Sequence, residues 1–284
     1  MPMTVLACLF SLVLLLCFPE HCSSCAREAL KVWGMDVVPS LFPYMVFCRL
    51  LSETLRAKRV PAVWAVPVLG LLGGSPSGAA VIGCYADELS RRQILAMYAL
   101  TGAVSPMFLI GSVGRWLHSP KTGVLLACTQ VIGSLASFLA ALFYLPVSEQ
   151  QQGKKRLDTL PRLNAIRESI SALFSVGGYI VVFSVISGMM DLIPFLCDEF
   201  RTLVHVVLEV AGGMHNLSVS DLPLKMKTVV LSAASSFGGF SILFQNLFFL
   251  RPVGIDPRDL LPIAAIRSAC SAAAMLLLYS IMIL

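Results

Sequence analysis

Long apolar blocks alternate with short polar links along the chain. A helix needs about 20 mainly apolar residues to cross a bilayer. Six blocks approach or exceed that length: residues 3–18, 35–55, 94–114, 122–146, 173–197 and 259–283. The pattern therefore predicts an all-α integral membrane fold with about six transmembrane helices.

Two further apolar blocks, residues 61–86 and 226–250, contain helix-breaking residues at their centres. The first holds residues 73–78 (GGSPSG), and the second holds residues 235–239 (SSFGG). Glycine and proline at this density interrupt a helix and free backbone N–H and C=O groups. A membrane tolerates such groups only where protein buries them or where they line a cavity. We therefore expect a re-entrant helical hairpin, or a broken helix, in each block.

Composition excludes a soluble globular protein. Hydrophobic residues make up 57% of the 284 residues and charged residues only 13%, against about a quarter charged in soluble domains. The net charge of +5 does not indicate a nucleic-acid partner, because the basic residues cluster in short links at 56–59, 91–92 and 154–156. That is the pattern of cytoplasmic loops in a membrane protein.

These basic links predict a topology. With the link at 150–167 inside, the links at 56–59 and 87–92 also lie inside. Block 61–86 then enters and leaves from the cytoplasmic side, and block 226–250 enters and leaves from the outside. The two hairpins are thereby expected to enter from opposite faces.

The predicted arrangement is a diverged inverted repeat, with residues 35–115 matched to 173–284; chance similarity between apolar segments is the alternative. Such repeats are typical of secondary transporters, whose sites lie between the halves at broken helices. We expect four regions along the chain. They are an N-terminal transmembrane anchor (1–25), a first repeat with its hairpin (26–147), a cytoplasmic basic linker with an amphipathic helix (148–172) and a second repeat with its hairpin (173–284). We expect residues 1–18 to be retained, because no basic residue precedes them and no small-residue cleavage site follows.

The candidate substrate site gathers small and polar residues at the helix breaks. Half-helix N-termini there offer free N–H groups to an anion. The candidate residues are Ser75, Pro76, Ser77, Gly78, Thr101, Ser105, Ser236, Gly238, Gly239, Gln245, Asn246 and Arg267. Close helix packing through small residues is the alternative for the glycines and serines.

Among the ionisable residues in apolar surroundings, four are candidates for a function: Asp36, Asp191, Glu209 and Arg267. An intramembrane charge is costly and indicates function by default. Arg267 is expected to pair with Asp191 or to meet an anionic substrate. Asp36 and Asp191 lie near span ends, and Glu209 is expected in an interfacial helix.

Motifs of soluble enzymes are absent from the sequence. There is no Walker loop, no G-x-S-x-G elbow and no dinucleotide-binding fingerprint, and the histidines lack metal-ligand spacing. We expect no catalytic activity, no cofactor and no metal; the coupling ion is undefined.

Six short motifs occur in order along the chain: residues 39–44 (PSLFPY), 73–79 (GGSPSGA), 105–114 (SPMFLIGSVG), 176–180 (VGGYI), 208–213 (LEVAGG) and 235–239 (SSFGG). This ordered set resembles a known family, the YlbJ-type sporulation integral membrane proteins with nucleoside recognition or gate domains. The resemblance implies a hairpin design related to that of concentrative nucleoside transporters. It also implies a role in endospore formation, moving dipicolinic acid from the mother cell toward the forespore. The chain departs from the family at residues 101–104 (TGAV), where Asn-type residues are usual, and at Ser75, where an aromatic is usual.

These observations lead to three functional hypotheses. The first is a multi-pass transporter of a small anionic organic molecule, dipicolinic acid by the resemblance. The alternatives are a non-transporting scaffold or receptor acting through residues 198–227, and a nucleoside-type transporter. The expected partners are the bilayer, the anionic solute, and a second copy of the chain or other sporulation membrane proteins. The expected location is the bacterial inner membrane or the forespore outer membrane.

Overall fold

The computed structural model describes residues 2–144, 163–193 and 195–282, and these residues are almost entirely helical. Helices account for 87% of them, and none of them forms a strand. The basic linker expected at 148–172 lies largely outside the described residues, which resume at the start of α10.

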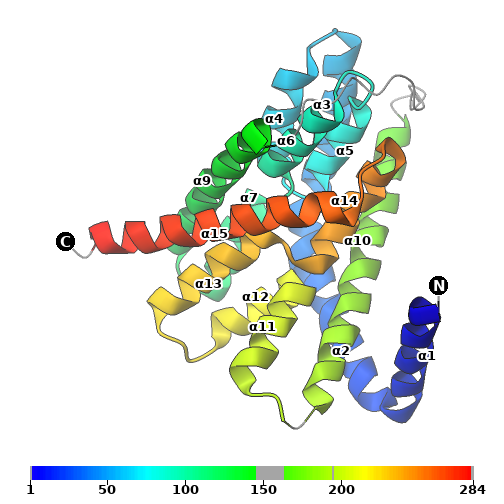
Figure 1. Cartoon of the computed structure of the whole chain (residues 1–284), viewed down its shortest axis with the longest axis vertical. Helices are drawn as coiled ribbons and strands as arrows, with labels where there is room; N and C mark the ends of the chain where they lie inside the picture. Colours follow the sequence, from blue (N-terminus) through cyan, green and yellow to red (C-terminus); the bar gives the residue numbers. More distant parts are fainter. Residues whose placement is uncertain (1, 145–162, 194, 283–284) are drawn as a thin grey trace.

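The N-terminal half begins with the helix α1 (Pro2–Cys17), which stands apart from the bundle (Figure 1). A long helix follows, composed of α2 (Pro19–Val32), a π-helical turn η1 (Trp33–Val37) and α3 (Val38–Ala57). Two short helices, α4 (Ala62–Gly73) and α5 (Ser77–Cys84), then pack against each other as a hairpin. The half closes with a broken helix and a straight one, whose parts are α6 (Arg91–Thr101), α7 (Pro106–Phe108), η2 (Leu109–Val113), α8 (Gly114–Trp116) and α9 (Pro120–Tyr144).

The second half repeats this order of elements. A long helix, α10 (Leu163–Met189) with η3 (Met190–Leu192), is followed by a packed pair of short helices, α11 (Asp198–Leu208) and α12 (Val210–Val219). A broken helix and a straight one complete it, with parts α13 (Leu224–Phe237), α14 (Gly239–Leu250), η4 (Arg251–Val253) and α15 (Pro257–Met282).

Six helical stretches among the described residues are long and apolar enough to cross a membrane: Pro19–Ala57, Arg91–Trp116, Pro120–Tyr144, Ala165–Leu192, Leu224–Val253 and Pro257–Ile281. The expected number of spans is confirmed, but the set differs from the prediction. The predicted span at 3–18 corresponds to α1, which has only 16 residues, whereas 224–253 is long enough to cross.

The second hairpin is not where the sequence suggested. Residues 226–250 form a broken helix whose two parts diverge at Gly238 (Figure 1). Arg91 forms an ion pair of 2.6 Å with Asp259, so the links at 87–92 and 254–259 lie at the same end of the molecule. The second link therefore lies at the same end as the first, and residues 226–250 take the broken-helix form, one of the two forms that the sequence left open. The hairpin of the second half is α11–α12. Membrane re-entry and the inverted repeat stay predictions.

The two hairpins have their open ends at opposite ends of the long axis. We call the end with the α3–α4 and α5–α6 links the upper end, and the end with the α10–α11 and α12–α13 links the lower end (Figure 1). The tip of α4–α5 is residues 74–76, and the tip of α11–α12 is Glu209.

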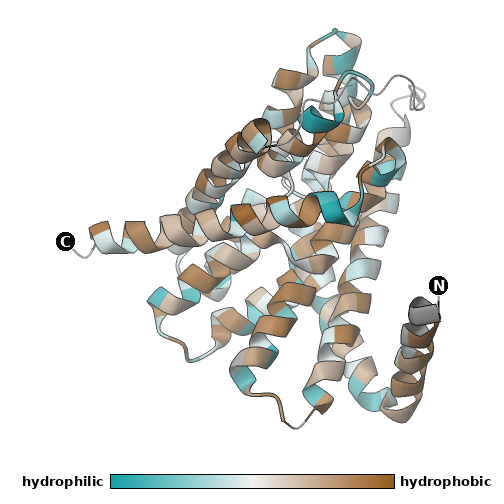
Figure 2. Cartoon of the chain, in the orientation of Figure 1, coloured by the Kyte–Doolittle hydropathy of each residue, from teal (hydrophilic) through white to brown (hydrophobic). Residues whose placement is uncertain are grey.

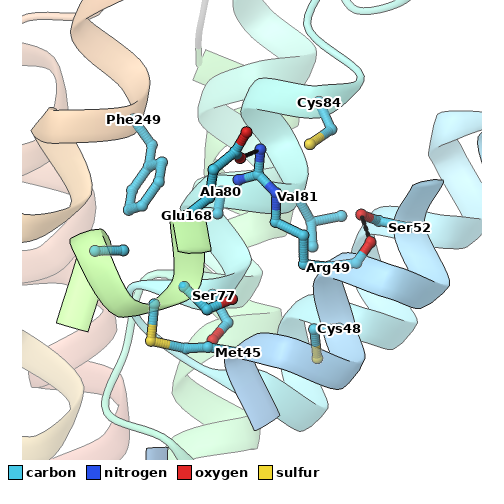
Figure 3. Close-up of a pocket in the computed structure, with 12 residues that line it drawn as sticks. Met45, Cys48, Arg49, Ser52, Ser77, Ala80, Val81, Cys84, Glu168 and Phe249 are labelled. Atoms are coloured by element: carbon cyan, nitrogen blue, oxygen red, sulfur yellow. Dashed lines mark hydrogen bonds and ion pairs between the residues drawn. The ribbon is translucent and has the colours of Figure 1, made fainter. Parts of the chain in front are cut away.

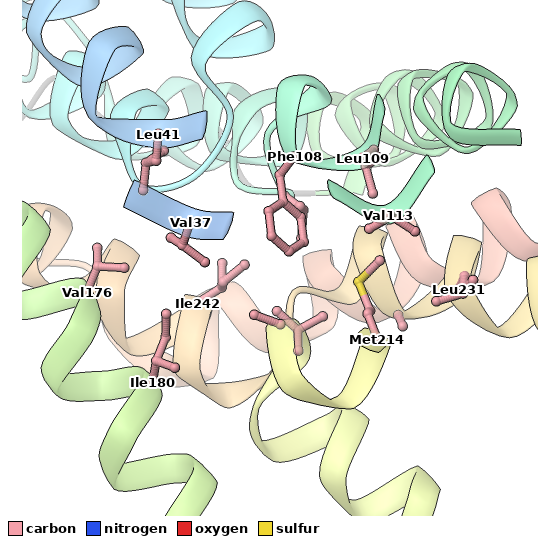
Figure 4. Close-up of a cluster of buried hydrophobic side chains, with 14 of the residues drawn as sticks. Val37, Leu41, Phe108, Leu109, Val113, Val176, Ile180, Met214, Leu231 and Ile242 are labelled. Carbon is pink, nitrogen blue, oxygen red and sulfur yellow. The ribbon is translucent and has the colours of Figure 1, made fainter. Parts of the chain in front are cut away.

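The outer surface of the bundle is strongly apolar, as Figure 2 shows. Large side chains such as Trp64, Phe174 and Phe47 are 71%, 66% and 69% exposed. Soluble monomers rarely expose so much apolar surface, whereas lipid covers it without cost. The interior is also apolar, and the cluster in Figure 4 joins side chains of η1, α3, α10, α12 and α14 around Phe108 and Ile242.

Candidate functional site

Four interruptions of the helices meet in the interior. At the α4–α5 tip, the Ser75 N–H donates to Ala103 O (2.7 Å), in the break between α6 and α7. The Val104 N–H in that same break donates to Ser235 O (3.3 Å) at the end of α13. At Gly239 a Cβ would lie 3.1 Å from Val207 O, next to the α11–α12 tip. Each hairpin tip thus abuts the broken helix of its own half, and the two breaks abut each other.

Arg267 fastens two of these breaks together. Its fully buried guanidinium on α15 donates to four carbonyls at the ends of α6 and α13, namely Ser236 O (2.6 Å), Gly102 O (3.0 Å), Tyr98 O (3.2 Å) and Ala99 O (3.3 Å). The last carbonyls of a helix lack intrahelical partners, and a cation stabilises them. The expected pairing with Asp191 is wrong, because Asp191 lies at the end of α10 and contacts His205 Nε2 at 3.0 Å.

Several other candidate residues also hold the breaks together. Ser75 Oγ donates to Asn246 Oδ1 (2.7 Å), and Asn246 Nδ2 contacts Gly102 O (3.4 Å). Ser236 Oγ donates to Ser271 Oγ (2.6 Å). Thr101 packs against Gly78, where a Cβ would lie 2.6 Å from the Thr101 Cβ. These contacts connect the breaks to one another, and the Asn246 amide reaches one of the backbone carbonyls that a break leaves free.

A small central cavity of about 40 Å³ lies beside the breaks. That volume holds no more than a few water molecules. Its apolar walls come from η1, α3, α7, α10, α12 and α14. Its polar lining consists of Ser40, Ser75, Ser105, Ser241, Gln245 and Glu209. The fully buried Ser241 hydroxyl has no hydrogen-bond partner among the described residues. A buried hydroxyl without a partner marks a place for water or a ligand.

A lower cavity of about 620 Å³ lies between α2, the end of α10 and the α11–α12 hairpin. Its lining is rich in ionisable groups: Glu28, Lys31, Asp36, Asp191, His205, Glu209 and His215. Glu209 lines both this cavity and the central one.

Two upper cavities lie between α3, α5, the start of α10 and α14. The inner one, of about 20 Å³, includes Ser77 (Figure 3). The outer one, of about 420 Å³, includes Arg56 and Asp87. Both include Arg49 and Glu168, which form an ion pair between α3 and α10 (Figure 3).

One face of α10 runs past all four cavities. Six of the α10 residues that line them recur every three or four positions: Glu168, Ala172, Val176, Ile180, Ser184 and Ser187. Ser169 and Ser171 also line the upper cavities. At 1.5 Å per residue this stripe is about 28 Å long, close to the roughly 30 Å hydrocarbon core of a bilayer. The α2–α3 helix presents a matching stripe of Val32, Asp36, Ser40, Met45, Arg49 and Arg56. The cavities therefore form a row between two long helices.

Glu209 is the site residue that the sequence placed wrongly. It is 2% exposed and accepts hydrogen bonds from Ala211 N (2.9 Å) and Gly212 N (2.5 Å) at the start of α12. It belongs to a buried hairpin tip and not to an interfacial helix. An acidic residue inside an apolar run was a sequence signal that Glu209 has a special role. The sequence did not show which helices pack around it.

The structure divides the predicted site residues into two groups. Four of them line the cavities: Ser75, Ser77, Ser105 and Gln245. The others are not among the lining residues and lie at or beside the breaks: Pro76, Gly78, Thr101, Ser236, Gly238, Gly239, Asn246 and Arg267. Sequence reasoning missed Arg49, Glu168 and Ser241.

Comparisons with known proteins give one informative similarity. No family model matches the chain, and no solved structure matches it. The sporulation integral membrane protein YlbJ of Bacillus subtilis (strain 168) is 23% identical to it over 295 residues, covering 84% of this chain and 72% of that protein.

The similarity and the apolar helices support the same assignment. The six stretches long enough to span a bilayer make the chain a multi-pass protein of the cell membrane. The similarity to YlbJ covers most of both chains, as the ordered motifs predict. The similarity to YlbJ therefore supports the resemblance of this chain to the YlbJ-type sporulation integral membrane proteins.

Proposed function

We propose that the chain transports a small organic anion across the membrane, along the row of cavities between α2–α3 and α10, without catalysing a reaction. The observation that carries the proposal is the pair of stripes, because a single face of each long helix lines cavities from one end of the molecule to the other. Helix packing alone does not require such a row of separate cavities.

The charges give the route an orientation. The basic links at 56–59 and 91–92 lie at the upper end, which by the positive-inside rule is the cytoplasmic end. The outer upper cavity, lined by Arg56, is therefore the cytoplasmic vestibule, and the lower cavity faces the other compartment.

Dipicolinate, the solute implied by the family resemblance, is our candidate substrate. It is a flat aromatic ring with two carboxylates. The central cavity offers apolar walls, including Phe108 and Val176, and hydroxyl donors, including Ser241. At about 40 Å³ this cavity is too small for such a ring, so binding requires the hairpin tips to move apart. Closure around a solute is common in transporters built from broken helices.

A neutral nucleoside is the second candidate. The residues that line the central cavity include no lysine, arginine or histidine. The polar groups of this cavity are hydroxyls, one amide and one carboxylate. They can hydrogen-bond the sugar and the base of a nucleoside at least as well as they can bind a dianion. The scaffold hypothesis is less favoured, because much of α12 within 198–227 is buried, including Met214 and Leu217.

The test is uptake of radiolabelled pyridine-2,6-dicarboxylate or uridine by vesicles containing the purified full chain. Val176→Trp fills the central cavity and is expected to abolish uptake. Phe174→Trp, on the lipid-facing side of the same helix, is the matched control and is expected to transport normally. Each variant is first shown to be monodisperse by size exclusion. Transport of neither compound, or normal transport by Val176→Trp, would overturn the proposal.

A further inference from the structure

Glu209 lies where the central cavity meets the lower cavity. Its carboxylate forms no ion pair with a lysine, arginine or histidine among the described residues. It is the acidic side chain of the central cavity, and the unpartnered hydroxyl of Ser241 lines the same space.

Both protonation states of Glu209 have structural support. Two backbone N–H donors at the start of α12 stabilise the carboxylate. Burial without a cationic partner favours the neutral acid. The 620 Å³ lower cavity gives protons a route to the side chain.

The ionisable groups around Glu209 are engaged elsewhere or lie further out in the lower cavity. Asp36 of η1 pairs with Arg115 of α8, and Asp191 of η3 pairs with His205 of α11. Glu28 and Lys31 of α2 are exposed. His215 of α12 packs edge-on against the Trp116 ring. α14 presents the neutral residues Ser241 and Gln245 to the central cavity.

An anionic solute and an ionised Glu209 repel each other in a small, buried cavity. We propose that Glu209 binds a proton from the lower cavity as the anion occupies the central cavity, and that it releases the proton when the anion leaves. Only a proton moves to and from a carboxylate oxygen, and no other bond changes. This inference rests on the proposed transport function and adds the coupling ion.

Two measurements test the inference separately from transport. The first is infrared titration of the purified chain, in which a protonated-carboxyl C=O band is expected to appear as the pH falls. Glu209→Gln should remove that band. Glu28→Gln, at an exposed position of the lower cavity, should leave it. A spectrum that is the same in the chain and in Glu209→Gln would overturn proton binding at Glu209, whether or not any solute is transported.

The second measurement follows protons during transport. Vesicles containing a pH-sensitive dye are expected to change internal pH when pyridine-2,6-dicarboxylate is added. Glu209→Gln should lose this proton flux and the accumulation driven by a pH gradient. Accumulation without proton flux, or normal pH dependence in Glu209→Gln, would refute the coupling while leaving the transport proposal intact. Absence of uptake and exchange in every preparation would refute the transport proposal.

Discussion

Arg49 on α3 and Glu168 on α10 form an ion pair at the boundary between the two upper cavities. Their side chains are 12% and 30% exposed, and Phe249 of α14 lies beside them in both cavities. The pair joins the two long helices that carry the lining stripes. We therefore expect this pair to act as a gate between the row of cavities and the basic, upper end.

Breaking this ion pair is expected to open the upper end. In a cysteine-depleted background, Ser77→Cys reports access to the inner upper cavity. Arg49→Ala should raise its labelling rate by a membrane-impermeant thiol reagent from the cytoplasmic side, and Glu168→Gln should do the same. Arg91→Ala breaks an ion pair that lines neither cavity and is the control. Equal labelling in all variants would exclude the gate.

The position of the hairpins predicts a topology that differs from the sequence-based scheme. Cysteines at Arg59, Arg91 and Pro252 should all be labelled from the cytoplasmic side, and a cysteine at Asp221 from the opposite side. The reason is that Pro252 lines the same cavity as Arg56 and Asp259 pairs with Arg91. Labelling of Pro252 and Asp221 from one side would restore a re-entrant hairpin at 226–250.

Arg267 is expected to hold the fold together and not to recognise the solute. Arg267→Met removes the guanidinium donor from four buried carbonyls, of which Tyr98 O and Gly102 O keep another donor. An unsatisfied buried group costs about 1–3 kcal/mol. The variant should lose on the order of 3 kcal/mol of stability or more, seen as a lower melting temperature in detergent. Arg267→Lys should rescue it only in part, since an ammonium cannot reach both helix ends as the guanidinium does. A variant of normal stability that binds no solute would instead place Arg267 in the substrate site.

Gly74 is expected to tolerate no side chain. Its φ is +61°, and a Cβ there would collide with the backbone of Ser105. Gly74→Ala should therefore destabilise the tip of α4–α5 by about 1–3 kcal/mol and reduce uptake. Gly178→Ala on α10 is the matched control, since nothing lies within 4 Å of its added Cβ. A thermal melting series checks both, and equal behaviour of the two variants would contradict the close approach at Gly74.

The sequence by itself determined the class of the fold and the places where its helices break. Apolar length sets the spans, because the bilayer fixes how many residues a helix needs. Glycine and proline set the breaks at 74–76 and 238–239, because they act on their own backbone. Those effects are local, so they can be predicted from the residues themselves.

Only the tertiary structure decided which broken elements belong together. The apolar run around Glu209 has the length and apolarity of an interfacial helix as well as of a hairpin tip. Its packing against the α13–α14 break assigned it to the hairpin tip. Arg267 donates to carbonyls at the end of α6, about 165 residues earlier in the chain. Its charge in the sequence had suggested a carboxylate partner instead. The lining stripes of α3 and α10 contain both apolar and polar residues. Hydropathy along the sequence therefore could not distinguish residues that line a cavity from residues that pack in the core. Contacts between distant residues depend on how the helices pack as a set, and the pattern along a single chain does not contain that information.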